Sequence, residues 1–278
     1  MKIGIIGLGL IGGSMAKAIR LNTDHYVLGM DIDEKIITKA KIIEAINEEL
    51  TEKNTGECDM IILALYPTAS IEVVKKYAHL IKKGAYIIDC GGVKEKVCDS
   101  ICEIATKNGF IFVGGHPMAG IEKIGFKYSK AEIFANASMI LTPDNNIKTE
   151  DITNIKNFFL SLGFGKITLK TPKDHDRIIA YTSQLAHVLS NAYVKSETAQ
   201  EHRGLSAGSF KDLTRVAYLN ETMWTELFLE NKENLISEIS KLINNLSEYK
   251  VAIENNDAIK LKQLLKNGRE LKESLDFD

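Results

Sequence analysis

Apolar residues in the first 170 positions fall into short runs that alternate with segments of helical periodicity. The β-rich runs are Lys2–Ile6, Tyr26–Met30, Met60–Leu65, Tyr86–Asp89 and Phe110–Val113. The helical patterns between them cover Met15–Leu21, Asp33–Ile46, Ile71–Ile81 and Lys94–Lys107. Because strands that alternate with helices of ~10–15 residues form βαβ units, the pattern predicts a parallel, doubly wound sheet. Two more runs, near Met139–Leu141 and Ile167–Lys170, flank an amphipathic segment around Ile152–Leu162 and are expected to complete the sheet.

From Pro172 onward the pattern is helical. Pro172 suits a first helical turn, and Thr171 suits the cap before it. All four prolines and 17 of the 20 glycines lie in residues 1–172, so the tight turns belong to the first part of the chain. The sequence therefore predicts an α/β domain over residues 1–170 and an all-α domain of nearly uninterrupted helix over residues 171–278.

Apolar residues near the end of the chain form a narrow helical seam. Its members are Leu235, Ile239, Leu242, Leu246, Tyr249 and Ile253, spaced 4, 3, 4, 3 and 4. That spacing is typical of helix–helix packing. The seam fits internal packing and a subunit interface equally well, and both readings stay open.

Composition limits the class of protein. A net charge of −2 provides no basic field for nucleic acid or anionic lipid. No stretch reaches the ~20 apolar residues of a membrane span, and glycines interrupt the apolar run that resembles a signal peptide. The four cysteines lack CxxC spacing, which favours buried thiols over a metal site. We expect a cytoplasmic protein without a metal.

A glycine motif follows the first strand. Gly7-x-Gly9-x-x-Gly12 comes directly after Lys2–Ile6 and opens a helix, so its amides and the helix dipole can face a pyrophosphate. Asp31 ends the second strand, 24 residues after Gly7, where a carboxylate can bond ribose hydroxyls and would repel a 2′-phosphate. The motif predicts NAD rather than NADP. The predicted cofactor site consists of Gly7, Gly9, Leu10, Ile11, Gly12 and Asp31.

A histidine follows the strand Phe110–Val113. His116 lies in a predicted loop with Pro117 and several small residues, at the strand edge where nicotinamide lies in such folds. An imidazole with a pKa of ~6.5 is a suitable proton acceptor for an alcohol that is being oxidised.

Three segments resemble one enzyme family. Gly7–Ser14, His116–Gly120 and Gly208–Arg215, together with Trp224, are similar to prephenate dehydrogenase. The resemblance implies a homodimer, joined through the helical domain, that converts prephenate to 4-hydroxyphenylpyruvate and carbon dioxide with reduction of NAD in tyrosine biosynthesis. It also implies that His116 accepts the proton of the ring hydroxyl, and that no metal is needed because aromatisation drives the decarboxylation.

The same resemblance assigns substrate contacts. Arg215 matches the family's substrate-binding arginine, whose planar fork can hold a carboxylate, although a salt bridge with Asp212 is the plain structural alternative. His187 matches a position that contacts substrate, and a buried structural histidine is equally compatible. Glu122 matches an acid near the mouth of the site and could equally be a surface charge. Helical spacing places Gln184 on the same polar face as His187 and Asn191.

One residue departs from the family pattern. The family commonly has a serine in its GSVK segment, where the hydroxyl assists the histidine and the substrate. Here that position is Gly92. We expect either water to supply the hydrogen bond or the rate to fall.

Three other functions fit parts of the sequence. Arogenate dehydrogenase would use the same chemistry on a substrate with an amino group in place of the keto group. A β-hydroxyacid dehydrogenase would use a helical lysine as its acid and base. A non-catalytic NAD-sensing protein would keep the glycine motif and Asp31, but would have no use for His116 and Arg215 together.

Overall fold

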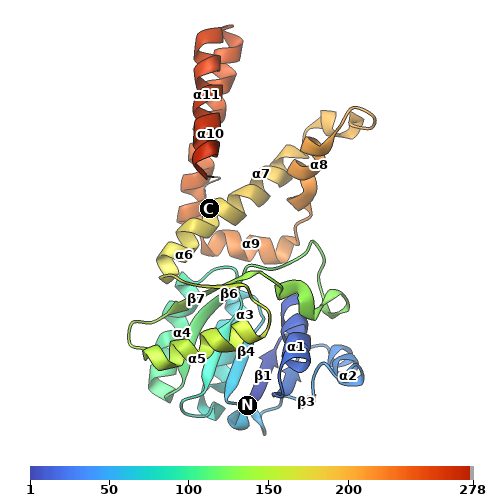
Figure 1. The fold of residues 1–278 in the computed structure, drawn as a ribbon, viewed down its shortest axis with the longest axis vertical. Helices are drawn as coiled ribbons and strands as arrows, with labels where there is room; N and C mark the ends of the chain where they lie inside the picture. The colour runs from blue at the N-terminus through green and yellow to red at the C-terminus, as the bar shows by residue number, and fades with distance from the viewer. Residues whose placement is uncertain (276–278) are drawn as a thin grey trace. The chain divides into compact units, whose positions relative to one another are not determined.

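The computed structural model describes residues 1–275, which divide into two compact units, Met1–Asn231 and a second unit that begins at Lys232. In the described residues of the first unit, eight strands form one sheet in the order β3-β2-β1-β4-β5-β6-β7-β8 (Figure 1). The strands are β1 (Lys2–Ile6), β2 (Tyr26–Met30), β3 (Glu48–Glu49), β4 (Met60–Leu63), β5 (Tyr86–Asp89), β6 (Ile111–Pro117), β7 (Ser138–Pro143) and β8 (Lys166–Leu169).

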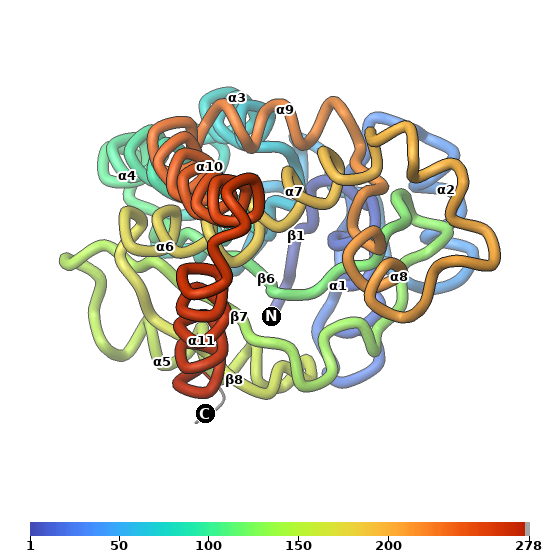
Figure 2. The backbone as a smooth tube through the Cα atoms, turned by 90° about the horizontal axis from the view of Figure 1, so that it is seen from above, coloured from blue at the N-terminus to red at the C-terminus, as the bar shows by residue number. Residues whose placement is uncertain are grey.

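Helices cover both faces of this sheet (Figures 1 and 2). One apolar core holds buried residues of α1 (Leu10–Asn22), α2 (Glu34–Ile42) and α5 (Thr149–Ser161). The other core holds buried residues of α3 (Pro67–Tyr77) and α4 (Glu95–Asn108). The α/β class and the doubly wound arrangement are therefore confirmed, since β-strands with helices on both faces bury apolar side chains on both sides.

The sheet differs from the prediction in three ways. The two-residue strand β3 gave no apolar signal, because both of its residues are glutamates. Strand β7 runs antiparallel to β6, so the sheet is mixed. Strand β6 continues through Pro117, so His116 lies in a strand opposite Ile140 rather than in a loop.

Residues 172–231 belong to the first unit and are helical with several breaks. They form α6 (Pro172–Ile179), a π-helical turn (Ala180–Leu185), α7 (Ala186–Tyr193), α8 (Gly208–Thr214) and α9 (Glu221–Glu230). The predicted cap is confirmed, since the Thr171 side chain accepts a hydrogen bond from the Asp174 amide at 3.1 Å. The prediction of nearly uninterrupted helix is wrong between α7 and α9, where Gly204 has a positive φ of 79°. Figure 1 shows α6 and α9 beyond the carboxyl ends of the strands.

The second unit contains α10 (Lys232–Glu254) and α11 (Ala258–Leu275). The Tyr249 hydroxyl donates to the Leu264 carbonyl at 3.3 Å, and Lys260 pairs with Glu248 at 2.8 Å. Leu246 and Ile253 of the predicted seam are more than half exposed, at 55% and 60%. Within one chain the seam is therefore not a fully buried face. Among the described helices of both units, none has the length and apolar character required to cross a bilayer.

Candidate active site

The glycine loop between β1 and α1 has the tight geometry that its sequence predicts. Gly7 has a φ of +89° and donates its amide hydrogen to the Met30 carbonyl at 2.8 Å. A Cβ atom at Gly12 would lie 1.8 Å from the Gly7 carbonyl oxygen, so a side chain there would force the helix away from the strand. A Cβ atom at Gly9 would meet no atom within 4 Å, which leaves open space above the loop.

The first turn of α1 presents its amides at this space. The helix begins at Leu10, and no described side chain caps it at Gly9. Unpaired amides at a helix N-terminus carry partial positive charge, which favours a phosphate. Leu10, Ile11 and Gly12 supply the amides of this turn.

Asp31 lies beside the glycine loop, as predicted. Its Oδ2 atom accepts a hydrogen bond from the Leu8 amide at 2.7 Å, and its Oδ1 atom accepts one from the Asp33 amide at 3.0 Å. Two backbone donors therefore fix the carboxylate at the end of β2. Each carboxylate oxygen can accept more than one hydrogen bond, so the group can still bind hydroxyls.

His116 lies at the carboxyl edge of the sheet and contacts a second histidine. Its Nδ1 atom lies 2.9 Å from Nε2 of His175, which is 59 residues away on α6. Nδ1 of His175 lies 2.7 Å from Oδ1 of Asp176. Asp176 also accepts hydrogen bonds from the amides of Lys94 and Glu95, at 2.8 and 2.9 Å. The imidazole of His116 is thus the outer end of a chain that is anchored at the start of α4.

The pKa of His116 is held well below its ordinary value of 6.5. Burial is the main cause, and the His175 ring and the Lys94 cation add to it. His116 as a residue is only partly buried, and its lowered pKa leaves the ring neutral and able to accept a proton at neutral pH.

A buried ion pair joins the two segments that lead to His116. Lys94 and Asp89 form a salt bridge with side chains that are 0% and 1% exposed. Asp89 also accepts hydrogen bonds from the Gly91 and Gly115 amides, each at 3.0 Å. Asp89 therefore fixes the loop after β5 against the strand residue that precedes His116.

Three of the five predicted substrate contacts, Arg215, Glu122 and His187, gather in a second, more exposed cluster. Arg215 Nη1 lies 2.5 Å from Glu122 Oε1, so Arg215 pairs with Glu122 rather than with Asp212. The side chains are 64% and 40% exposed. The His187 ring packs against Trp224 with ring centroids 4.1 Å apart and planes tilted by 32°, and its Nδ1 atom lies 2.8 Å from the Ser183 carbonyl. Burial lowers the pKa of His187, and the nearby Arg215 cation lowers it further.

Gln184 does not join that cluster. Its side chain is buried, donates to the Leu227 carbonyl at 3.0 Å and accepts from Asn231 at 2.8 Å. The prediction that it shares a polar face with His187 assumed α-helical spacing, whereas residues 180–185 form a π-helical turn that changes the phase. Its polar atoms fasten α9 instead of facing a ligand.

Gly92 lies in the loop between β5 and α4. A Cβ atom there would lie 3.4 Å from both terminal methyl carbons of Leu227, which is ordinary contact distance. The fold therefore has room for a Cβ atom at this position. The missing hydroxyl is a chemical difference rather than a steric requirement.

Four site residues were not predicted. Asp89, Lys94, His175 and Asp176 are buried polar or charged residues that surround His116. Two signals were available: an aspartate that ends an apolar strand five residues before a lysine, and a His-Asp pair in the first turn after Pro172. Neither signal specifies its partner, because the contact between His116 and His175 is long-range.

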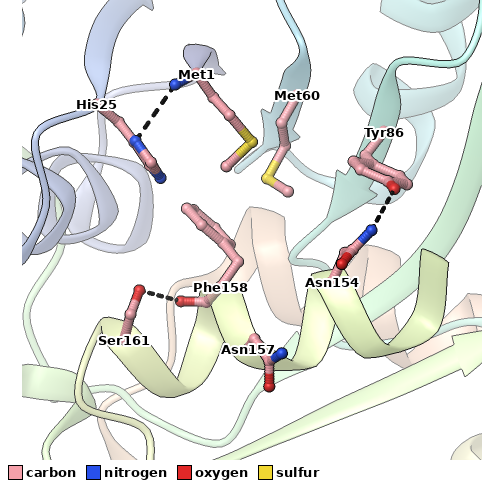
Figure 3. A pocket seen from close by; sticks show the side chains of 8 residues that line it. All are labelled: Met1, His25, Met60, Tyr86, Asn154, Asn157, Phe158 and Ser161. Carbon is pink, nitrogen blue, oxygen red and sulfur yellow. Dashed lines mark hydrogen bonds between the residues drawn. The ribbon is translucent and has the colours of Figure 1, made fainter. Parts of the chain in front are cut away.

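The residues that line the pocket in Figure 3 place it at the amino ends of the strands, the opposite edge from His116. Its lining includes His25, Met60 and Tyr86, which precede or begin β2, β4 and β5, and several residues of α5. Open α/β sheets bind ligands at the carboxyl ends of their strands, whereas this pocket is at the amino ends. It contains none of the predicted site residues.

Two family models match most of the chain. The model for the prephenate dehydrogenase nucleotide-binding domain matches residues 15–168, and the model for the prephenate dehydrogenase dimerization domain matches residues 171–267. The chain belongs to the prephenate dehydrogenase family. The second model begins at the cap of α6, so within this family the helices that carry His175, His187 and Arg215 are part of the dimerization domain.

Relatives in the family support the assignment along the whole chain. A prephenate dehydrogenase from Lactococcus lactis subsp. cremoris is 31% identical, with 99% of this chain and 78% of the relative covered. The crystal structure of A. aeolicus prephenate dehydrogenase, in complex with hydroxyphenyl propionate and NAD⁺, matches with a TM-score of 0.85 and 28% identity. That match covers 99% of this chain and 98% of the other. Synechocystis arogenate dehydrogenase matches with a TM-score of 0.81 and 26% identity over 99% and 100% of the two chains.

Proposed function

We propose that this chain catalyses the oxidative decarboxylation of prephenate to 4-hydroxyphenylpyruvate, with NAD as hydride acceptor, in tyrosine biosynthesis. One observation carries the proposal. In a member of this family, His116 is a partly exposed residue at the carboxyl edge of a sheet whose first βα loop has the geometry of a dinucleotide site.

The residues around the glycine loop fit a dinucleotide. Open space at Gly9 and the uncapped first turn of α1 suit a pyrophosphate, and we assign its binding to Gly7, Gly9, Leu10, Ile11 and Gly12. Bound NAD supplies a hydride acceptor at the strand edge. Asp31 would bond the adenosine ribose hydroxyls, so we expect tighter binding of NAD than of NADP in titration calorimetry. Tighter binding of NADP would refute this role for Asp31.

The chemistry requires one base. The neutral imidazole of His116 would accept the proton of the ring hydroxyl at C4 while the hydride leaves C4, and a C4 carbonyl forms. The bond from C1 to its carboxylate then breaks and releases carbon dioxide, and its electron pair passes through the ring to the C4 oxygen. His116 returns its proton to that oxygen. Aromatisation drives this step, so the residues at the site need to supply only proton transfer and positioning.

The exposed cluster would bind the substrate. Arg215 is the cation best placed to exchange Glu122 for a substrate carboxylate, because its side chain is largely exposed and its fork can form two hydrogen bonds. We assign His187 and Gly92 to the wall of the site and Glu122 to its mouth. Gln184 acts through packing, since both ends of its amide are bonded within the protein.

One assay tests the function directly. Purified protein is given prephenate or arogenate, each with NAD⁺ or NADP⁺, and reduced nicotinamide is followed by absorbance. We expect the fastest turnover with prephenate and NAD⁺. A clear preference for arogenate would favour the second candidate, which the match to Synechocystis arogenate dehydrogenase supports. No turnover in any of the four mixtures would favour a non-catalytic NAD-binding protein.

We also propose a cytoplasmic homodimer that is joined through residues 171–278, with cofactor binding in residues 1–170. The family's dimerization model over residues 171–267 and the exposed apolar side chains of α10 and α11 support the dimer. Light scattering behind a sizing column should give about twice the mass of 30.9 kDa. A monomer at micromolar concentration would contradict the proposal.

A further inference from the structure

His175 and Asp176 form a buried, hydrogen-bonded pair that contacts only one nitrogen of the His116 ring. The His175 and Asp176 side chains are 0% and 2% exposed. His116 Nδ1 lies 2.9 Å from His175 Nε2, and His175 Nδ1 lies 2.7 Å from Asp176 Oδ1. Water therefore does not compete for these contacts, and each contact needs one donor and one acceptor.

The protons can be placed from the Asp176 end. An ionised carboxylate only accepts hydrogen bonds, and Asp176 already accepts two from the Lys94 and Glu95 amides at the start of α4. His175 must therefore donate from Nδ1. Burial lowers the pKa of His175, which supports a neutral ring with a single proton. Its Nε2 atom is then an acceptor, so His116 must donate from Nδ1.

We propose that His175 is a positioning residue that holds His116 in the tautomer with hydrogen on Nδ1, so that Nε2 is unprotonated and available to accept the substrate's proton. The inference rests on the proposed function for its kinetic consequence only. A histidine whose other nitrogen is fixed in this way is a base at one defined atom, whereas an unsupported ring divides between two tautomers.

Two substitutions separate this role from simple packing. In His175→Asn, the short amide lies where Nδ1 lay and can still donate to Asp176, but nothing accepts from His116. In His175→Gln, the longer amide reaches the place of Nε2, and its oxygen can accept from His116. We expect His175→Asn to lower kcat by ~10- to 100-fold with KM changed less than about twofold, since an isosteric change that misplaces the ring proton costs orders of magnitude. We expect His175→Gln to recover most of that loss.

The control for these substitutions is His79→Asn, at an exposed histidine outside the site. It should leave kcat and KM unchanged. Equal losses in His175→Asn and His175→Gln, with equal falls in melting temperature, would identify His175 as a packing residue and overturn the proposal.

A spectroscopic measurement decides the tautomer without substrate. Long-range ¹H–¹⁵N correlation spectra of the labelled protein distinguish the protonated from the unprotonated ring nitrogen, and the His116 signals are assigned by their loss in His116→Asn. We expect hydrogen on Nδ1 in the wild-type protein. Hydrogen on Nε2 would overturn the proposal, even if His175→Asn fails to fold. Because this reading needs no turnover, a protein that does not oxidise prephenate would refute the proposed function and leave the tautomer assignment to be judged by the spectra.

Discussion

The two clusters of the site differ in how firmly their side chains are held. Asp89, Lys94, His175 and Asp176 are almost fully buried, and several backbone amides bond their carboxylates. Arg215 and Glu122 are held by a single ion pair between exposed side chains. Buried, fully bonded charges are costly to disturb, whereas exposed pairs contribute little and exchange partners easily. The proposed proton transfer thus relies on buried side chains that keep their partners. The proposed substrate binding relies on an ion pair whose partner can be exchanged.

The largest effect is expected where a buried charge loses its partner. Lys94→Met leaves the Asp89 carboxylate buried without its cation and should lower the free energy of unfolding by about 3–5 kcal/mol. Chemical denaturation measures it. The matched control is Lys107→Met on the same helix, whose pair with Glu103 at 2.6 Å has side chains 69% and 72% exposed and should be worth less than about 1 kcal/mol. Equal losses at Lys94 and Lys107 would contradict the distinction between buried and exposed ion pairs.

The next effect concerns the base. His116→Asn keeps a polar side chain of similar width but no basic nitrogen, so kcat for prephenate should fall by ~10²-fold or more. Substrate affinity should be retained, which stopped-flow binding can check. Turnover close to that of the wild-type enzyme would show that His116 takes no part in the reaction.

Substrate capture should respond more weakly and in a different constant. Arg215→Gln should raise the KM for prephenate by about tenfold and change kcat less, because one charge-assisted contact to a carboxylate is lost. Arg177→Gln is the control, since its side chain is 62% exposed and pairs with Asp174 outside the site. An unchanged KM in Arg215→Gln would mean that Arg215 serves only its ion pair with Glu122.

The pH profile tests the state of the fixed cluster. The depressed pKa of His116 keeps its base form populated below pH 6.5, so kcat/KM should stay level from neutral pH down past 6.5 and fall only in more acidic solution. The loss appears on the acid side because protonation removes the acceptor. A half-maximal point at or above pH 6.5 would contradict the environment described for His116.

The smallest effect is expected at Gly92. Because a Cβ atom at this position would lie at contact distance from Leu227, Gly92→Ser should fold normally and raise kcat by a few-fold at most, through one added hydrogen bond. Gly91→Ser is the contrasting control. Its Cβ atom would lie 3.1 Å from Asp89 Oδ2, so a side chain at position 91 should disturb the buried ion pair. A large fall in kcat for Gly92→Ser, at unchanged stability, would show that the open space at Gly92 is itself required.

Local signals made the fold and the nucleotide loop predictable. Short apolar runs marked most strands, the glycine spacing marked the turn before α1, and Thr171 marked the start of α6. Position 116 was found as a candidate base, but its strand conformation was missed because Gly114 and Gly115 weaken the β pattern. His175 could not be connected to it, since a contact across 59 residues leaves no local trace. The face on which Gln184 lies was predicted wrongly, because a helical periodicity of 3.6 does not reveal a single π-helical turn.

The π-helical turn at Ala180–Leu185 joins α6 and α7 into one continuous helix. Residues after the turn are out of phase with an α-helical count that starts before it. His175 lies before the turn and His187 after it, so each histidine keeps its own direction around the axis. Because i→i+5 hydrogen bonds place one residue more in the turn than i→i+4 bonds do, removing one residue there would restore α-helical bonding and leave the parts on both sides in nearly the same setting. Such a deletion should leave the His187–Trp224, Asn191–Ala217 and His116–His175 contacts in place and disturb only residues of the turn, such as Gln184 with its bond to the Leu227 carbonyl. The π-helical turn therefore accommodates one extra residue while the parts of the helix that carry His175 and His187 both keep their contacts.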